Sequence, residues 1–369
     1  MIMPVGTSAD RPPPAPPRPA SPAKRVAALA GLLIVVLVLV AIALVFAGGP
    51  RTSSPADVSS TGSQSQPVPP PATAASVAPA PAPAGQLRFV DDSHALPNPV
   101  QGDAGTALDA QHGVVAGGVD ANGHLSDQVV ELSPQASRLL APLPVPVRDA
   151  SAAAIAGTAY LFGGRDSAGA GRGAILQMGP SGGAQQVGRL PQATWGAAAV
   201  TIGGTAYVVG GNAGGRSLTS VVAWRPGDNA RIVAQLPKGL SYPAVGVIGG
   251  QVIIAGGTSD RGPSRAVYGF DPSSGQVSSI LALPHPLTHA AGAALDGRLF
   301  LLGGVRSVGG TQTDETLAYD PTSTTVSSAG RLPEPLSDGA VVALSDRLLV
   351  AGGVNDAGRV SGRLISGAR

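Results

Sequence analysis

The 369-residue sequence contains no cysteine, which excludes disulfide bonds, thiolate metal sites and cysteine nucleophiles. Aromatic residues make up only 3% of the chain and charged residues only 12%. A net charge of +3 lies before residue 26, and the remainder of the chain is close to neutral. Because nucleic-acid binding requires a clustered basic face, we predict no nucleic-acid partner.

Glycine and proline, in contrast, are abundant, with 52 and 35 residues respectively. This composition argues against a coiled coil or a long-helix protein, which would be rich in alanine, glutamate, lysine and leucine. The length is compatible with one large domain and appended segments, or with two domains of medium size.

One long apolar run divides the chain. Val26–Ala47 contains 22 residues without a charged or strongly polar side chain, enough for a helix that crosses a bilayer. The arginine and lysine residues that precede the run predict a cytoplasmic N-terminus. A cleaved signal peptide is the alternative, but the run exceeds the usual length of a signal sequence's apolar region. We therefore predict an uncleaved, single-pass anchor in the cell membrane.

The segments on either side of this run are rich in proline. Residues 1–25 are predicted to form a disordered cytoplasmic tail whose P-x-x-P spacings could dock into an aromatic groove. Residues 48–86 combine proline with serine, threonine and alanine, and are predicted to form a semi-rigid stalk. The remaining residues, 87–369, are expected to lie outside the cytoplasm.

Residues 87–369 contain six repeats, each marked twice. An apolar run ends in a Gly-Gly pair at Gly117, Gly163, Gly210, Gly256, Gly303 and Gly352. A Leu-Pro pair stands 20 or 21 residues earlier, at Leu96, Leu143, Leu190, Leu236, Leu283 and Leu332. Because the distance between the two markers is nearly constant in all six copies, they establish an internal repeat of about 47 residues.

Each repeat is predicted to contain four short strands. A small-residue run such as 150–155 follows Leu-Pro, and a tight turn leads into the apolar run before Gly-Gly. The predicted turns are Ala156-Gly157, Gly203-Gly204, Gly249-Gly250, Asp296-Gly297 and Ser345-Asp346, dipeptides that accept a positive φ. Third strands are expected at 221–224, 266–270 and 316–319, each followed by a fourth. This pattern is typical of a β-propeller.

The ends of the repeat array indicate how the propeller closes. Only one strand is expected after the last Gly-Gly pair, and one isolated strand, 86–90, precedes the first Leu-Pro. We predict that this N-terminal strand completes the C-terminal blade and protects its edge.

In residues 87–369, the sequence resembles the kelch-repeat propellers. Leu143–Gly164 is similar to the segment of the family that begins at a proline-flanked arginine and ends in Gly-Gly. The family's third strand ends in an aromatic-Asp-Pro motif, which Phe270-Asp271-Pro272 and Tyr319-Asp320-Pro321 resemble. Val277 and Val326 stand where the family has tryptophan. The resemblance implies an all-β fold: a six-bladed, kelch-like β-propeller with four-stranded antiparallel blades, here after one N-terminal transmembrane helix. It leaves function open, because kelch propellers include scaffolds, sugar-handling enzymes and oxidases.

Two aligned residues per repeat are expected at the mouth of the central channel. The first row is Gln101, Arg148, Trp195, Ser241, Thr288 and Ser337, and the second is Gly102, Asp149, Gly196, Tyr242, His289 and Asp338. The loops after Gly-Gly emerge at the same end. Polar residues that vary where the repeat is otherwise uniform are candidates for binding a ligand or partner: Arg148, Asp149, Trp195, Tyr242, His289, Asp338, Arg165, Asn212 and Arg306. The opposite end of the propeller carries tight hairpins. These short turns are expected to extend too little beyond the strands to contact a ligand.

Structural roles compete with these assignments. Arg148 could simply hydrogen-bond backbone carbonyls, and Trp195 and Tyr242 could fill gaps between small side chains. Asp149, His289 and Asp338 could meet as metal ligands, but spacing alone does not show that they converge. We therefore predict no metal and no cofactor.

The function favoured by the sequence is non-enzymatic: a membrane-anchored propeller that binds a protein or glycan outside the membrane through its loops. One alternative is a sugar-active kelch enzyme similar to a mutarotase, although the rows contain no obvious acid–base pair. A galactose-oxidase-like copper enzyme is excluded, because its cofactor requires a cysteine. Another alternative is the sensing ectodomain of a membrane complex.

Overall fold

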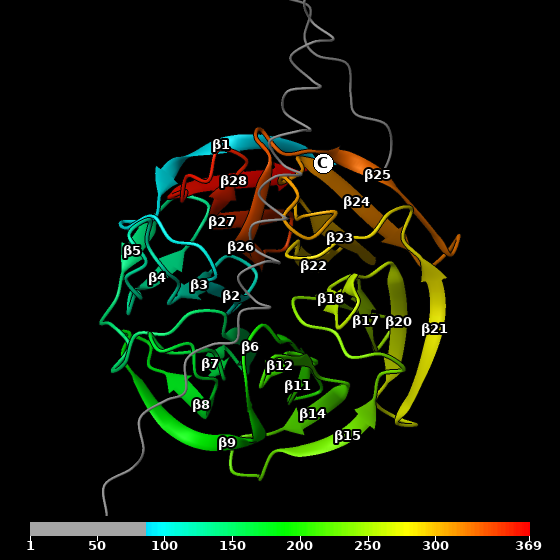
Figure 1. Cartoon of the computed structure of the whole chain (residues 1–369). Coiled ribbons are helices and arrows are strands. Elements are labelled where there is room, and N and C mark those ends of the chain that lie inside the picture. The colour runs from blue at the N-terminus through cyan, green and yellow to red at the C-terminus, as the bar shows by residue number, and fades with distance from the viewer. Residues whose placement is uncertain (1–85) are drawn as a thin grey trace, which may run out of the picture. The chain divides into compact units, whose positions relative to one another are not determined.

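The computed structural model describes residues 86–369, which form a six-bladed β-propeller with four antiparallel strands in each blade (Figure 1). The predicted tail, membrane span and all but the last residue of the predicted stalk lie outside these residues. Within residues 86–369, no helix has the length and apolar character needed to cross a membrane.

The strands fall into four classes by their position in a blade. The innermost strands are β2 (Ala104–Ala107), β6 (Ser151–Ile155), β10 (Ala198–Ile202), β16 (Ala244–Ile248), β22 (Ala291–Leu295) and β26 (Leu336–Ala343). The second strands are β3 (Gly113–Ala116), β7 (Thr158–Phe162), β11 (Thr205–Val209), β17 (Gln251–Ala255), β23 (Arg298–Leu302) and β27 (Arg347–Asn355). The third strands are β4 (Val129–Leu132), β8 (Arg172–Met178), β14 (Ser220–Trp224), β20 (Ala266–Asp271), β24 (Glu315–Asp320) and β28 (Arg363–Ala368). The outermost strands are β5 (Ser137–Leu139), β9 (Ala184–Thr194), β15 (Arg231–Gln235), β21 (Gln276–Ala282), β25 (Thr325–Arg331) and β1 (Arg88–Ala95).

The turns between the first two strands agree with the sequence in four blades and differ in one. In Ala156-Gly157, Gly203-Gly204, Gly249-Gly250 and Asp296-Gly297 both residues have a positive φ, as two-residue hairpin turns require. Neither Ser345 nor Asp346 has a positive φ. The turn nevertheless lies at the predicted residues, since the Leu344 N–H donates to the Arg347 carbonyl across it at 2.9 Å; only the expected positive φ is absent.

The Gly-Gly pairs join neighbouring blades. In every repeat, the N–H of the second glycine donates to a carbonyl of the segment that leads from the following Leu-Pro into the next blade, as Gly304 does to Leu336 at 2.7 Å. The last junction, from Gly353 to Val100 at 2.8 Å, closes the ring. A Cβ on the first glycine of each pair would collide with that same carbonyl oxygen. The repeated glycines are therefore required by the close approach of two backbones.

The Leu-Pro leucines contribute to the cores between blades. Six hydrophobic clusters each combine side chains of two adjacent blades, and all six of these leucines are buried. The bulkiest buried side chain is Trp224, which packs edge-on against Tyr160 and Phe162 of the preceding blade at centroid distances of 4.9 and 5.8 Å. The fold is stabilised mainly by this burial of apolar surface between neighbouring blades.

Strand β1 completes the last blade. It pairs antiparallel with β28, from Arg88 opposite Ala368 to Ala95 opposite Arg363, and the two strands lie side by side in Figure 1. Leu87 is buried in the core between the last two blades, and the Phe89 ring packs over Gly367. The observed strand begins two residues later than the predicted strand 86–90 and extends five residues further.

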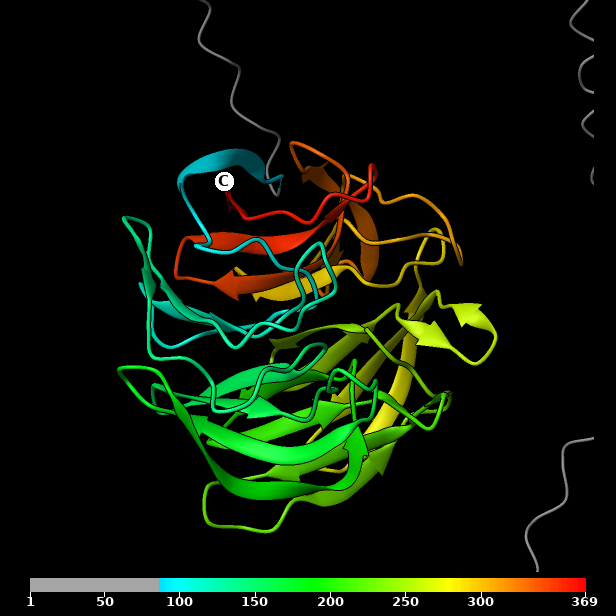
Figure 2. The same cartoon turned by 60° about the vertical axis from the view of Figure 1, so that its left-hand side comes forward.

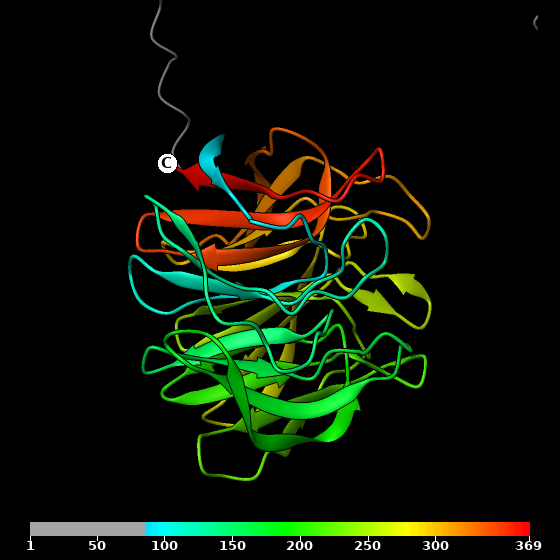
Figure 3. The same ribbon diagram turned by 90° about the vertical axis from the view of Figure 1, so that its left-hand side faces the viewer.

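One face of the propeller carries the loops that follow Gly-Gly. Two of these loops form small hairpins, β12 (Asn212–Ala213) with β13 (Arg216–Ser217) and β18 (Thr258–Ser259) with β19 (Gly262–Pro263). The β18–β19 hairpin projects clear of the blades in Figures 2 and 3. We call this face, which surrounds the entrance to the channel, the mouth face.

Candidate functional site

The backbone of the mouth is a ring built from the second row of aligned residues. Gly102, Asp149, Gly196, Tyr242, His289 and Asp338 all adopt left-handed φ values between 52° and 66°. At five of the six junctions between blades, the N–H of one of these residues donates to the carbonyl of the preceding one, at 2.6–3.1 Å. Four of the six are not glycine, and such strained conformations concentrate at functional sites. The side chains of the row are therefore held in a rigid, inward-facing arrangement.

The first row supports this ring from the side. Each of its residues bridges, backbone to backbone, to the residue directly after the Gly-Gly pair of its own blade, as Arg148 does to Arg165 and Trp195 to Asn212. The segment after Leu-Pro and the segment after Gly-Gly thus meet at the same end of each blade, as predicted.

The side chains of the mouth form a continuous arc that begins with an ion-pair cluster on the second blade. Arg148 and Arg165 both donate through Nε to Oδ2 of Asp149, at 3.0 and 2.5 Å. The Asp149 side chain is only 6% exposed, so two guanidinium groups compensate one nearly buried carboxylate.

Aromatic side chains continue the arc across the third and fourth blades. The Arg165 guanidinium lies 4.3 Å from the centre of the Trp195 ring, a cation–π contact. Trp195 packs against Tyr242 at 5.8 Å, and Tyr242 stacks on the imidazole of His289 at 3.8 Å. A Cβ at Gly196 would lie 3.0 Å from the Tyr242 ring, so this glycine is needed for the ring to lie flat across the mouth.

The arc ends in a hydrogen-bonded chain on the fifth and sixth blades. Nδ1 of His289 lies 2.5 Å from Oδ1 of Asp338, and the Ser337 hydroxyl donates to Oδ2 at 2.7 Å. Burial by itself would raise the pKa of Asp338, but the bonds from His289 and Ser337, with the charges of His289 and Arg148, lower it below its ordinary value. The sequence placed the two residues next to each other in the second row, but the row alignment does not show that the side chains form an acid–base pair.

Two predicted site residues lie outside the arc. Asn212 is buried, and its side-chain oxygen accepts from the Gly215 N–H, so it shapes its own hairpin. Arg306 is on an exposed loop of the fifth blade and pairs with Glu315 at 2.6 Å. The structure thus gathers seven of the nine predicted residues: Arg148, Asp149, Trp195, Tyr242, His289, Asp338 and Arg165.

Asp103 is a mouth residue that the sequence analysis missed. Its carboxyl group is shielded from solvent, lies against Gly352 and accepts no hydrogen bond of normal geometry from residues 86–369. Burial raises the pKa of Asp103 well above its ordinary value, and the nearby charge of Asp338 adds to the effect. The signal was present: the other repeats have Ala150, Ala197, Pro243, Ala290 and Gly339 at this position.

The cavity enclosed by the mouth is small. It has a volume of about 120 Å³ and is lined by the second row and the residues that follow it. Behind it, the channel between the innermost strands holds about 310 Å³ and is lined mainly by alanine, glycine and valine. Among residues 86–369, no three histidine, aspartate or glutamate side chains are grouped so as to hold a metal ion.

Comparison with known proteins supports the architecture. No family model matches the sequence, and no curated protein matches it. The solved structure of YjhT is similar, with a TM-score of 0.64 and 16% sequence identity over 73% of this chain and 95% of that chain. The fold is a six-bladed, kelch-like β-propeller. At this level of identity the similarity extends to the fold and not to the ligand or activity.

Replacing Asp103 by asparagine is expected to raise the melting temperature more at pH 7 than at pH 4. An unfolded aspartate ionises near pH ~4, whereas the folded protein retains this proton to higher pH. The folded state of the wild type therefore binds more protons over this window, and its stability falls as the pH rises. The uncharged asparagine removes that loss. Thermal melts of both chains at the two pH values test this, and an equal difference at pH 4 and pH 7 would contradict it.

Proposed function

We propose that this protein is a single-pass, membrane-anchored scaffold that binds a protein or a glycan outside the membrane through the mouth face of its propeller. The size of the mouth cavity, about 120 Å³, carries the proposal. Ligand pockets usually have volumes of about 300–1,000 Å³. A partner would therefore lie across the mouth rather than enter it.

The chemistry of the mouth supports surface recognition. Trp195, Tyr242 and the paired arginines Arg148 and Arg165 are of the residue types that contribute most to binding at protein interfaces. The contacts among these side chains hold them in place before binding, which reduces the conformational entropy lost on association. Around them, the exposed tips of three loops carry Arg216, Arg261 and Arg359. Exposed aspartates, Asp260 and Asp356, lie on two of the same loops, so the rim offers both signs of charge to a partner.

The anchor is part of the same proposal. It is based on the apolar segment Val26–Ala47 and the basic residues before it. With the tail in the cytoplasm, residues 48–86 would act as a spacer that sets how far the mouth face is from the bilayer.

A sugar-active enzyme is the second candidate, and the contact between His289 and Asp338 favours it. A histidine held by a carboxylate can transfer protons near neutral pH. An enzyme would need a place for its substrate beside this pair, and the Tyr242 ring already stacks there on the imidazole. Turnover of a sugar that is lost in His289→Gln would favour this candidate over the scaffold.

Photo-cross-linking tests the scaffold function directly. A diazirine amino acid at position 216, on the tip of the mouth-face hairpin, is expected to cross-link a partner in native membranes. The same amino acid at position 323, in the exposed turn at the opposite end of the fifth blade, serves as the control. Equal amounts of cross-linked product at both positions, or none at position 216, would contradict binding of a partner by the mouth face.

A further inference from the structure

A second cavity lies at the end of the propeller opposite the mouth, between the third and fourth blades. It has a volume of about 380 Å³, three times that of the mouth cavity and within the usual range for ligand pockets. We propose that this cavity binds a sugar that carries a carboxylate group, such as a uronic acid. The proposal is independent of the function assigned to the mouth face, because the two sites share no residue.

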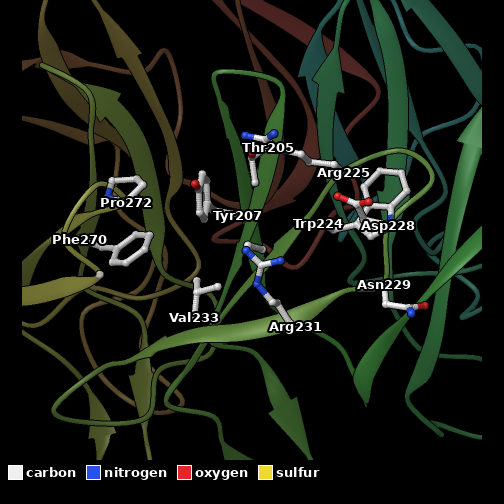
Figure 4. A pocket seen from close by; sticks show the side chains of 12 residues that line it. Thr205, Tyr207, Trp224, Arg225, Asp228, Asn229, Arg231, Val233, Phe270 and Pro272 are labelled. Atoms are coloured by element: carbon white, nitrogen blue, oxygen red, sulfur yellow. Dashed lines mark hydrogen bonds between the residues drawn. The ribbon is translucent and has the colours of Figure 1, made fainter.

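One wall of the cavity is apolar and rigid. Phe270 is 1% exposed and packs edge-on against Tyr207, with ring centres 5.5 Å apart. Tyr207 is half-buried, so one side of its ring remains open to the cavity beside Pro272. Figure 4 shows these three rings together on one side of the cavity. Such a wall can pack against the C–H face of a sugar ring.

The opposite side of the cavity carries charged groups. Arg225 donates through Nε to the hydroxyl of Thr205 at 2.6 Å, and Arg231 extends from β15 toward the middle of the cavity (Figure 4). Within residues 86–369, neither guanidinium group forms an ion pair. Among the described residues that line the cavity, Asp228 is the only carboxylate, so the two arginines leave a net positive charge.

These groups together specify the class of ligand. A guanidinium group binds a carboxylate through two parallel hydrogen bonds, and no side chain among residues 86–369 pairs with the Arg231 guanidinium. Asp228 and Asn229, in the turn after β14, offer acceptors and donors suited to the hydroxyl groups of a sugar. A single carboxylate on the ligand would balance the excess positive charge. A neutral sugar would leave the arginines without a counter-charge.

The sequence predicts no binding site at this end of the propeller, because its hairpins are short. Thr205 and Tyr207 lie on the strand that begins after the tight turn Gly203-Gly204, and the cavity is also lined by residues of the turns 225–230 and 271–275 in two adjacent blades. No single repeat contains the site, since Tyr207 and the arginines come from the third blade and Phe270 and Pro272 from the fourth.

Titration calorimetry with the purified full-length chain in detergent tests the proposal. Methyl glucuronide is expected to bind at least tenfold more tightly than methyl glucoside, which has a neutral hydroxymethyl group in place of the carboxylate. Arg231→Gln is expected to weaken glucuronide binding at least tenfold. The matched control is Arg189→Gln, which removes an exposed arginine on the outermost strand of the second blade and should leave binding unchanged.

Several results would overturn the proposal. These are absence of glucuronide binding, equal binding of the two sugars, or full binding by an Arg231→Gln chain whose melting temperature matches the wild type. Because Arg231 is exposed, we expect that variant to fold. Loss of cross-linking at position 216 would leave these results unaffected, so the failure of one site is distinguishable from the failure of the other.

Discussion

Replacing Gly303 by alanine is expected to destabilise the propeller by about 3 kcal/mol, from the cost of a left-handed alanine and the loss of a buried hydrogen bond. Gly303 has a φ of 64°, and a Cβ at this position would collide with the Leu336 carbonyl oxygen of the next blade. That oxygen accepts the Gly304 N–H at 2.7 Å, so the junction between the fifth and sixth blades would have to open.

Gly297→Ala is the matched control for this experiment. Gly297 has a similar φ of 73°, but no atom lies within 4 Å of the position that its Cβ would occupy. This variant should show only the backbone cost, about 1–2 kcal/mol. Urea unfolding of both variants measures the difference, and equal destabilisation would mean that Gly-Gly is conserved among the repeats for its turn geometry alone and not for the contact between blades.

Deleting residues 86–95 is expected to lower the melting temperature by about 10 °C and to cause aggregation. Burial of Leu87 and Phe89 contributes about 4 kcal/mol on the usual scale for large apolar side chains, and each kcal/mol shifts the midpoint by about 2–4 °C in a protein of this size. The deletion also removes the partner of β28, whose unpaired edge could then add strands from other molecules.

A deletion of the ten preceding residues, 76–85, provides the control of equal length. Light scattering during a thermal melt distinguishes the two chains. A soluble monomer with an unchanged melting temperature after removal of 86–95 would contradict the closure by β1.

The repeated features of the fold could be predicted from the sequence, because each is determined by local chemistry that recurs six times. Gly203-Gly204 forms the expected turn since both residues tolerate a positive φ. The Leu-Pro and Gly-Gly markers define the blades because one places a leucine in each core between blades and the other allows two backbones to touch. Ser345-Asp346 forms its turn at the predicted place but without a positive φ, because a two-residue turn can close with more than one backbone conformation.

The candidate site was only partly predictable. Register alone placed Asp149 and Tyr242 in the same row, since residues at equivalent positions of a propeller surround one axis. The contact of Arg165 with both Asp149 and Trp195 depends on the direction of a long side chain, which sequence spacing does not determine. Asp103 lies one position beyond the two aligned rows, where the other repeats have alanine, proline or glycine, and the sequence does not show that its carboxyl group is buried.

The most direct test of the mouth face is the yield of the position-216 cross-link in the wild type and in Tyr242→Gly. Glycine suits the left-handed backbone at this position, as Gly102 and Gly196 of the same row show, so the variant should keep its fold. It removes the ring that joins Trp195 to His289. We predict at least a tenfold loss of the cross-linked partner from a variant that still unfolds in one cooperative transition, at a melting temperature lowered by the loss of the ring's packing. An undiminished yield from the folded variant would contradict the assignment of the mouth as the binding site.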